Sequence, residues 1–215
     1  MDNRNNMMDG LIYQNAMITQ PECLYQNLME KIVWDERMLS RKTASFGQAY
    51  QYSQMYYEEQ PFLAELEDCI LQLEHILGFK ANNCLINYYP DGRSKMGWHA
   101  DQWDVLADDT GIAIISLGAE RHLHFRSLPD YAEKKEYLLE SGSLIYMTQH
   151  VQKHWQHQIP SSETTKGRLS LTFRQLKCAS VHDKFHRTLI LSGFCLLKIA
   201  KISLNSSFFP KPIKR

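Results

Sequence analysis

The spacing of the hydrophobic residues changes once along this chain, from a helical period to a strand-like one. Between Pro61 and Gly78, seven apolar residues recur at intervals of about three and four, which predicts an amphipathic helix that the glycine ends. Beyond this helix the period becomes two, in short runs separated by Gly, Pro and Asp. These strand-like runs cover residues 84–89, 112–118, 121–127, 143–148 and 168–175.

The first third of the chain is less regular. We expect residues 1–15 to be a loose lead-in and Pro21 to begin a helix that continues through Trp34. Residues 41–57 are rich in Tyr, Ser and Gly without a helical period, which predicts hairpins or loops with a strand. Helices followed by many short strands predict an α+β fold, in which N-terminal helices pack on one sheet of a double-stranded β-helix, or jelly roll.

The charge distribution divides the chain near Cys178. Residues 1–177 hold 17 of the 24 Lys and Arg and 23 of the 24 Asp and Glu, so residues 178–215 keep 7 basic side chains against 1 acidic. We expect residues 1–177 to form one domain, with a core at about 20–177, and residues 178–215 to form a basic C-terminal tail. Because the body is acidic, nucleic-acid binding would depend on local basic residues or on the tail.

Cysteine usage and the ends of the chain bear on the compartment. The five cysteines are odd in number and show no CxxC spacing, which favours a reducing compartment over a disulfide framework. The first ten residues are polar and acidic, unlike a signal peptide. The apolar run 189–197 is far shorter than the roughly 20 residues of a membrane span. We therefore expect a monomer without a membrane partner, in the cytoplasm or, in a eukaryote, the nucleus.

A metal site is suggested by His99 and Asp101 in the segment GWHADQWD. On an extended segment, residues two apart point the same way, so an imidazole and a carboxylate can reach one ion. The segment HVQKHWQH offers His150, His154 and His157 as the third ligand. Two histidines and one carboxylate suit non-haem iron(II) oxygenases, and the lack of nearby cysteines disfavours a structural zinc site. A surface turn with a hydrogen-bonded histidine is the plainer alternative.

Two arginines point to an anionic ligand. Arg168 and Arg174 lie six residues apart in RLSLTFR, so they share one face of the predicted strand. Guanidinium groups on an otherwise apolar strand need partners. The partners would be Asp or Glu side chains, or a small dicarboxylate that arginine binds through both nitrogens. A metal triad followed by a two-arginine strand describes an iron and 2-oxoacid site.

With these features the chain resembles the AlkB family of iron(II)- and 2-oxoglutarate-dependent dioxygenases, from about Arg41 to Gln175. The resemblance rests on the ordered blocks LINYYPDG (85–92), WHAD (98–101), ISLGAERHLHFR (115–126), ESGSLIYM (140–147), HWQHQIP (154–160) and GRLSLTFRQ (167–175). The segment RKTASFG (41–47) is similar to the substrate lid of the family's DNA-repair members. The resemblance implies iron(II) as cofactor, and 2-oxoglutarate and dioxygen as cosubstrates.

The resemblance also implies roles for individual residues. It makes His99, Asp101 and His157 the catalytic iron ligands, because His157 occupies the ligand position of HWQHxxP. It implies that Asn87 and Tyr89 hydrogen-bond the cosubstrate. The strand residues implied to bind its carboxylates, or to add hydroxyl contacts between them, are Arg168, Ser170, Thr172 and Arg174.

The implied reaction is hydroxylation of the alkyl group of an N-alkylated base in DNA or RNA, with release of an aldehyde. Tyr50, Tyr52 and Ser53 fall where lid residues approach the substrate, and Tyr52 is the candidate to stack on a flipped base. Arg41 and Lys42 fall where the family contacts phosphates. Half-buried strand aromatics and a solvated basic surface are the plain alternatives for these residues.

One departure from the family pattern concerns the substrate. The repair enzymes typically carry an acidic residue two places after the ligand Asp, where this chain has Trp103, followed by Asp104. Trp103 could stack on a substrate or fill the core, and Asp104 could take over the acidic role. The alternative function is hydroxylation or demethylation of a protein, lipid or small molecule. A non-catalytic binding module and a structural zinc protein are the remaining alternatives.

Overall fold

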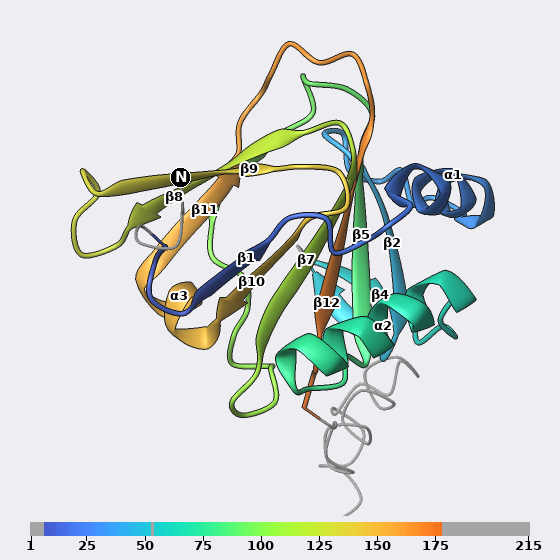
Figure 1. The fold of residues 1–215 in the computed structure, drawn as a ribbon, viewed down its shortest axis with the longest axis horizontal. Helices are drawn as coiled ribbons and strands as arrows, with labels where there is room; N and C mark the ends of the chain where they lie inside the picture. Colours follow the sequence, from blue (N-terminus) through green and yellow to red (C-terminus); the bar gives the residue numbers. More distant parts are fainter. Residues whose placement is uncertain (1–6, 53, 178–215) are drawn as a thin grey trace, which may run out of the picture. The chain divides into compact units, whose positions relative to one another are not determined.

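The computed structural model describes residues 7–52 and 54–177, which form two large antiparallel β-sheets, a separate two-stranded sheet, and helices beside the larger sheet (Figure 1). The larger sheet has the strand order β1-β10-β7-β12-β5-β2. Its strands are β1 (Leu11–Gln14), β10 (Leu144–Thr148), β7 (Gly111–Gly118), β12 (Arg168–Arg174), β5 (Asn83–Tyr89) and β2 (Lys42–Gly47). The smaller sheet has the order β6-β11-β8-β9. Its strands are β6 (Met96–His99), β11 (Trp155–Ile159), β8 (Arg121–Ser127) and β9 (Lys134–Leu139).

Helices α1 (Pro21–Lys31) and α2 (Ala64–Leu77) lie beside the larger sheet, on the side away from β8 and β11 (Figure 1). Leu28 of α1 and Leu66, Ile70 and Leu73 of α2 are buried in one hydrophobic cluster with apolar side chains of β5, β7 and β12. Gly78 ends α2 in the left-handed conformation, with φ of 76°. The predicted α+β jelly roll with N-terminal helices on one sheet is therefore confirmed.

Strand β12 shows how the two-residue period separates the core from the site. Leu169, Leu171 and Phe173 point into the cluster beneath the helices. The alternate residues Arg168, Ser170, Thr172 and Arg174 point toward the smaller sheet, and all four are buried. A second cluster between the two sheets contains apolar residues of β7, β8 and β10. Because both faces of the larger sheet are covered, polar groups facing the smaller sheet are withdrawn from water.

Several elements differ from the sequence-based expectation. Residues 1–15 are not a loose lead-in throughout, because β1 pairs with β10 at the edge of the larger sheet. The first helix ends at Lys31 rather than Trp34, and α2 begins at Ala64 rather than at Pro61. Strands β6, β9 and β11 and the short helix α3 (Gln149–His154) were not expected, because short segments with mixed polar residues give no clear period.

Residues 41–57 form β2 and the separate hairpin of β3 (Tyr50–Tyr52) and β4 (Met55–Tyr57), as the composition indicated. Ser53 lies outside the described residues, and so do residues 178–215, so the predicted basic tail and its boundary stay predictions. None of the described helices has the length and apolar character needed to cross a membrane.

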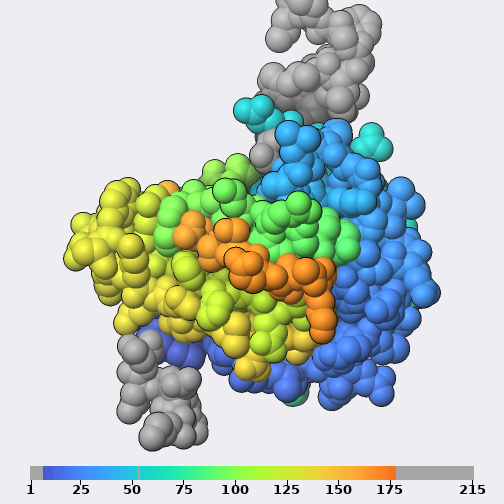
Figure 2. Space-filling view, turned by 90° about the horizontal axis from the view of Figure 1, so that it is seen from above, coloured from blue at the N-terminus to red at the C-terminus, as the bar shows by residue number. Residues whose placement is uncertain are grey.

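One buried cation joins segments that are distant in sequence. Arg121 of β8 is almost fully buried and donates hydrogen bonds to the backbone carbonyls of Ser94 (2.9 Å) and Pro160. Backbone hydrogen bonds also connect Gly92 with Ser162 and Thr164. In Figure 2 the orange segment after residue 150 accordingly lies against the green segment near residue 92. Arg121 thus holds together the loops that precede β6 and follow β11.

Candidate metal and cosubstrate site

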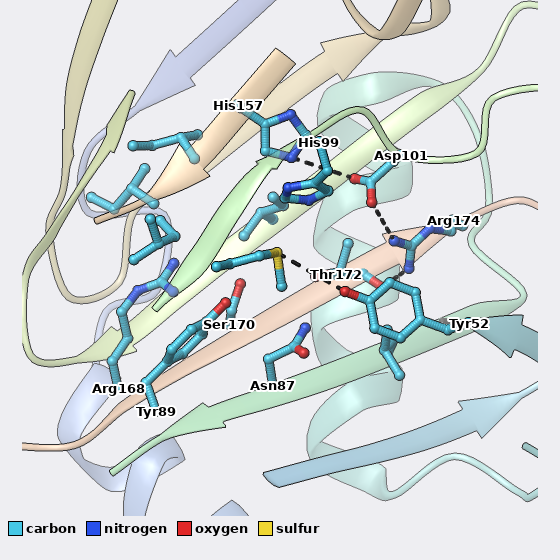
Figure 3. Close-up of a pocket in the computed structure, with 16 residues that line it drawn as sticks. Tyr52, Asn87, Tyr89, His99, Asp101, His157, Arg168, Ser170, Thr172 and Arg174 are labelled. Carbon is cyan, nitrogen blue, oxygen red and sulfur yellow. Dashed lines mark hydrogen bonds and ion pairs between the residues drawn. The ribbon is translucent and has the colours of Figure 1, made fainter. Parts of the chain in front are cut away.

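The pairing of β6 with β11 brings two histidines together. His157 and His99 are directly opposed in this antiparallel pair, and their ring centroids are 4.3 Å apart. Asp101 follows β6 by two residues, and its Oδ2 lies 3.8 Å from Nε2 of His157. One potential ligand atom from each of the three residues lies within 4.8 Å of the others (Figure 3). The residues predicted to bind iron thus form one cluster.

Burial prepares this cluster for a cation. Burial lowers the pKa of His157 to about 3, so its imidazole is neutral at physiological pH, as a metal ligand must be. His157 and Asp101 are close enough for an ion pair, but a neutral imidazole cannot form one. The two side chains are therefore neighbouring potential metal ligands. Burial alone would raise the pKa of Asp101, but the charge and hydrogen bond of Arg174, together with the two nearby histidines, lower it below its usual value, so the carboxylate stays ionised.

Neighbouring groups orient two of the three donors. Nδ1 of His99 lies 2.8 Å from the carbonyl oxygen of Gly97, which leaves Nε2 of His99 for an ion. The backbone N–H of Asp101 donates to Oε1 of the buried Gln152, at 2.9 Å. Gln152 belongs to α3, and nothing in its sequence context marked it as part of the site.

The other two candidate histidines lie outside this cluster. His150 and His154 are on α3, where their rings pack against each other at 4.2 Å. Nδ1 of His154 lies 2.9 Å from the carbonyl oxygen of His150 within the same helix. The geometry therefore agrees with the family-based choice of His157 as the third ligand.

The two arginines of β12 have different partners. Nη2 of Arg174 lies 3.4 Å from Oδ1 of Asp101, and the Arg174 guanidinium packs over the Tyr50 ring at 4.9 Å. Arg168 has no ion pair with any described carboxylate. Its Nη2 donates to Oγ of Ser116, but its Nε and Nη1 have no hydrogen-bond partner. The sequence predicted either a protein carboxylate or a bound dicarboxylate as the partner of each arginine. Arg174 has the protein carboxylate, whereas Arg168 has no carboxylate partner among the described residues.

An isolated charge at this position needs an anion. Arg168 is 1% exposed, and burial lowers its pKa to about 10, so the guanidinium is still protonated at physiological pH. The guanidinium of Arg168 lies 5.4 Å from the centroid of the Tyr89 ring. The guanidinium of the buried Arg121 lies 5.9 Å from the same centroid, so a second positive charge is close by. A buried charge without a counter-charge is strongly unfavourable. A carboxylate bound beside Arg168 would remove this penalty.

Polar side chains line the space between the arginines and the histidines. Asn87, Ser170 and Thr172 are buried there, and Figure 3 shows Ser170 and Asn87 below the histidine pair, with Arg168 on their left and Tyr52 on their right. Strand pairing explains this, because Ser170 is opposite Asn87 and Arg168 is opposite Tyr89 in the β12–β5 pair. The predicted cosubstrate residues therefore surround one interior pocket together with the candidate metal ligands.

The hairpin β3–β4 contributes the aromatic residues at the mouth of this pocket. Tyr50 and Tyr52 stack with ring centroids 6.3 Å apart, and Tyr50 is the more buried of the two. Tyr52 lines both the interior pocket and an adjoining hollow of about 410 Å³, which also reaches His99 and Asp101. Tyr52, which the resemblance assigns to the lid, therefore borders both the candidate metal site and the adjoining hollow.

The basic residues expected to contact phosphates are engaged within the protein. Arg41 donates from Nε to Oδ1 of Asn87 and from Nη2 to the hydroxyl of Tyr52, both at 2.8 Å. Lys42 donates to Oε1 of Glu36 at 2.5 Å. Arg41 thus points inward and connects the lid with the cosubstrate side chains. Phosphate contacts by Arg41 and Lys42 stay predictions, and each would first have to release its present partner.

The residues that depart from the family pattern are at the surface. Trp103 is 38% exposed, and Nζ of Lys153 lies 4.2 Å from its ring centroid. It does not fill the core, which leaves contact with a substrate as the functional option. Asp104 is also exposed, and its charge helps to raise the pKa of the buried Tyr50, so it lies near the lid.

Comparisons with known proteins agree with this geometry. Residues 3–174 match the family model described as "2OG-Fe(II) oxygenase superfamily". The rat protein "Alpha-ketoglutarate-dependent dioxygenase alkB homolog 3" is 28% identical over 177 residues, which is 73% of this chain and 60% of that protein. The human protein "DNA oxidative demethylase ALKBH2" is 31% identical over 147 residues, covering 63% of this chain and 56% of that one.

The fold also has a solved counterpart, titled "The structure of OsALKBH1". It has a TM-score of 0.58 and 18% identity, and the match covers 80% of this chain and all of that one. At this identity the likeness concerns the fold alone. The chain spans about three fifths of the length of the first curated relatives it matches. The AlkB-like resemblance predicted from the ordered blocks is confirmed.

Proposed function

Since the chain belongs to the 2OG-Fe(II) oxygenase superfamily, we propose that it is an iron(II)- and 2-oxoglutarate-dependent dioxygenase that oxidatively removes alkyl groups from N-alkylated bases in DNA or RNA. The family implies iron(II), 2-oxoglutarate and dioxygen. The observation that carries the proposal is the pairing of a His-Asp-His cluster, in which Asp101 and His157 are buried and His99 is half-buried, with a buried arginine that has no carboxylate partner among the described residues.

The residues present fit both the metal and the cosubstrate. His99, Asp101 and His157 would hold iron(II), because two imidazoles and one carboxylate match the donors that this metal takes in such enzymes. Arg168 would bind a carboxylate of 2-oxoglutarate, whose charge would satisfy its unpartnered Nε and Nη1 atoms. Asn87, Tyr89, Ser170 and Thr172 line the same pocket and would complete the cosubstrate site.

The chain's own contribution is positioning and exclusion of water. When bound, iron(II), 2-oxoglutarate and dioxygen would supply the chemistry that hydroxylates an alkyl C–H bond, with dioxygen as the oxidant. Arg174 keeps Asp101 ionised, and Gln152 fixes the backbone of Asp101. Tyr50 and Tyr52 cover the site from the solvent side. A hydroxyalkyl group on a base nitrogen then breaks down to the free base and an aldehyde.

The hollow beside Tyr52 is the proposed substrate entrance. It is lined by residues 96–102 together with Tyr50 and Tyr52, so a ring that enters it meets an aromatic face on one side and His99 on the other. A base inside a duplex cannot reach this depth, so the substrate must be single-stranded or flipped, at a few kcal/mol that is smallest for badly paired bases. Alkylated bases that pair badly are therefore favoured.

The direct test measures 2-oxoglutarate turnover and formaldehyde release over a panel of N-methylated DNA and RNA oligonucleotides. Equimolar succinate and formaldehyde with at least one methylated oligonucleotide, and no formaldehyde with its unmethylated counterpart, supports the proposal. Succinate without formaldehyde across the whole panel contradicts the nucleic-acid substrate but leaves the dioxygenase assignment standing.

The alternative substrate class is a protein, a lipid or a small molecule. It is favoured by one observation, which is that Arg41 and Lys42 both have partners within the protein and offer no free charge to a phosphate. Salt dependence separates the two classes. Affinity for an oligonucleotide should fall steeply as salt rises, because phosphate binding releases counterions, whereas affinity for a neutral small molecule should not.

Trp103 provides a test of substrate reading. We expect Trp103→Glu to change the order of preference among methylated bases, because it places an acidic group directly after Gln102, which lines the hollow, and removes an exposed aromatic surface. Fold stability should change by only about 0.5 kcal/mol, as for other exposed substitutions, and Lys153 can pair with the new carboxylate. The ratio of kcat/KM values across the panel is the measurement, and an unchanged order means that Trp103 does not read the base.

Tyr52 provides a test of the lid. Tyr52→Ala should lower kcat/KM for a methylated oligonucleotide about 10- to 100-fold, because stacking of a base on an aromatic ring contributes about 1–3 kcal/mol. Tyr52→Phe keeps the ring and serves as the matched control. If both variants lose the same activity, the hydroxyl that contacts Arg41 matters rather than the aromatic face. The KM for 2-oxoglutarate should be measured in parallel, because Tyr52 also borders the interior pocket.

We also propose that the protein is a monomer and that it acts in the cytoplasm or, in a eukaryote, in the nucleus. The described cysteines Cys23, Cys69 and Cys84 are free thiols, which suits a reducing compartment. Fractionation with an antibody against the native protein and measurement of its molar mass in solution would test both statements.

A further inference from the structure

A second group of metal-ligating side chains lies on the hairpin of β8 and β9, which projects at the left of Figure 1. His122 and His124 are two residues apart on β8, so they point to the same face of the smaller sheet. Glu136 of β9 is directly opposite His124 in the antiparallel pair. Strand register therefore brings two imidazoles and a carboxylate together without any contribution from the site already described.

The three side chains converge on one point. Nδ1 of His122 lies 2.5 Å from Oε1 of Glu136, and Nε2 of His124 lies 3.2 Å from Oε2 of the same carboxylate. One ligand atom from each residue lies within 4.8 Å of the others. An isolated ion pair would involve only one imidazole. Here both imidazoles contact the same carboxylate, which is also the arrangement expected if all three side chains bound one cation.

This group is separated from the candidate iron site by the sheet itself. The intervening residues Leu123 and Phe125 of β8 are buried on the opposite face, and the ring of Phe125 lies 5.7 Å from that of His157. His122 and Glu136 have side chains that are about half exposed, at 51% and 53%. Water can therefore reach the group from outside and fill the coordination positions that the protein leaves open.

One basic side chain on the same face, that of Arg126, has other partners. Arg126 follows His124 by two residues on β8, but its Nε and Nη2 donate to Oε1 of Gln156. Its guanidinium also lies over the rings of Trp98 and Tyr131, at 4.6 and 4.8 Å. These contacts hold its charge toward β6 and β11, so Arg126 does not compete for the carboxylate of Glu136.

We propose that His122, His124 and Glu136 form a second metal site that binds Zn²⁺ and that is independent of the 2-oxoglutarate reaction. Imidazole nitrogens and a carboxylate oxygen are donors that zinc accepts, and zinc imposes no geometry of its own on an open site. Since β9 is the edge strand of the smaller sheet and pairs with β8, an ion held by both strands stabilises the hairpin.

The test counts zinc ions bound by the full-length protein, by equilibrium dialysis with Zn²⁺ alone. The double variant His122→Asn/Glu136→Gln should bind one zinc fewer than the wild-type chain. A triad variant, His99→Ala/Asp101→Ala, should lose a different zinc, and combining both sets of changes should lose both. The matched control is His150→Asn/His154→Asn, which removes the histidine pair of α3. This pair has no carboxylate between its two rings, so the control variant should bind as many zinc ions as the wild type.

Two further measurements complete the test. Turnover of 2-oxoglutarate by the iron-loaded His122→Asn/Glu136→Gln variant should match the wild type, and its zinc-induced rise in Tm should be smaller. In the triad variant His99→Ala/Asp101→Ala, which lacks two of the three inner ligands, Cu²⁺ should broaden the backbone amide signals of residues 121–126 and 134–139. An unchanged zinc count in the folded double variant overturns the proposal, and so does an absence of broadening in β8 and β9.

Discussion

Replacing Asp101 by alanine is expected to abolish turnover of 2-oxoglutarate, with succinate production falling about 10³-fold or more, because a metal centre contributes several kcal/mol to the barrier and about 1.4 kcal/mol corresponds to a factor of ten. Asp101 is the only carboxylate in the described triad, so its loss leaves two imidazoles and no negative charge to bind a cation. Near wild-type succinate production would show that the triad does not hold the metal.

Folding must be separated from catalysis in this experiment. Asp101 is also the carboxylate beside Arg174, and removing one member of a buried charge pair costs about 3–5 kcal/mol. Asp101→Asn keeps an oxygen that can accept from Arg174 but removes the negative charge, so it should stay folded and still lose activity. His154→Ala, on the neighbouring helix α3, is the histidine control and should keep its turnover. Circular dichroism at the assay temperature distinguishes an unfolded variant from an inactive one.

Replacing Arg168 by methionine is expected to affect stability and cosubstrate binding in opposite directions. Without 2-oxoglutarate the variant should be as stable as the wild type or more so, because an apolar side chain of similar size replaces a buried charge that lacks a counter-charge. The KM for 2-oxoglutarate should rise about 100-fold, since a hydrogen-bonded charge pair buried at a binding site contributes about 2–5 kcal/mol.

Three measurements check this expectation, namely the Tm without ligand, the rise in Tm on adding 2-oxoglutarate, and the KM for 2-oxoglutarate. Arg121→Met is the matched control, because Arg121 is equally buried but donates to backbone carbonyls. It should lower the Tm through the loops it connects and should leave the ligand-induced rise in Tm largely intact. If Arg168→Met destabilises the ligand-free protein and leaves the KM unchanged, Arg168 has a structural role and does not bind the cosubstrate.

The arginines show where reasoning from sequence reached its limit. The six-residue spacing placed both on one face of a strand, and β12 has them so, because a strand has a period of two. The spacing did not show which of the two has a protein carboxylate as its partner. Arg174 contacts Asp101, which is 73 positions away in the sequence, because one sheet packs on the other. Spacing within one strand carries no information about such a contact.

Similar reasons explain the unexpected elements. β6 and β11 are short and carry mixed polar and aromatic residues, because one face holds the candidate metal ligands, so neither shows a clean alternation. Gln152 and Arg121 act through backbone groups of distant segments, and no local pattern marks them. Ordinary core strands such as β5 and β7 were predicted to within about a residue, because burial on both faces gives continuous apolar runs.

By itself the amino-acid sequence determined the fold class, the family and the identity of the candidate ligands, because period, ordered motifs and residue chemistry are local properties. Only the tertiary structure decided which groups meet. The register of β6 against β11 joined His157 to His99, and the packing of the sheets gave Arg174 a partner and left Arg168 without one. In the same way, the register of β8 against β9 placed the carboxylate of Glu136 beside His122 and His124. Contacts between strands are set by pairing and packing, which no single segment encodes.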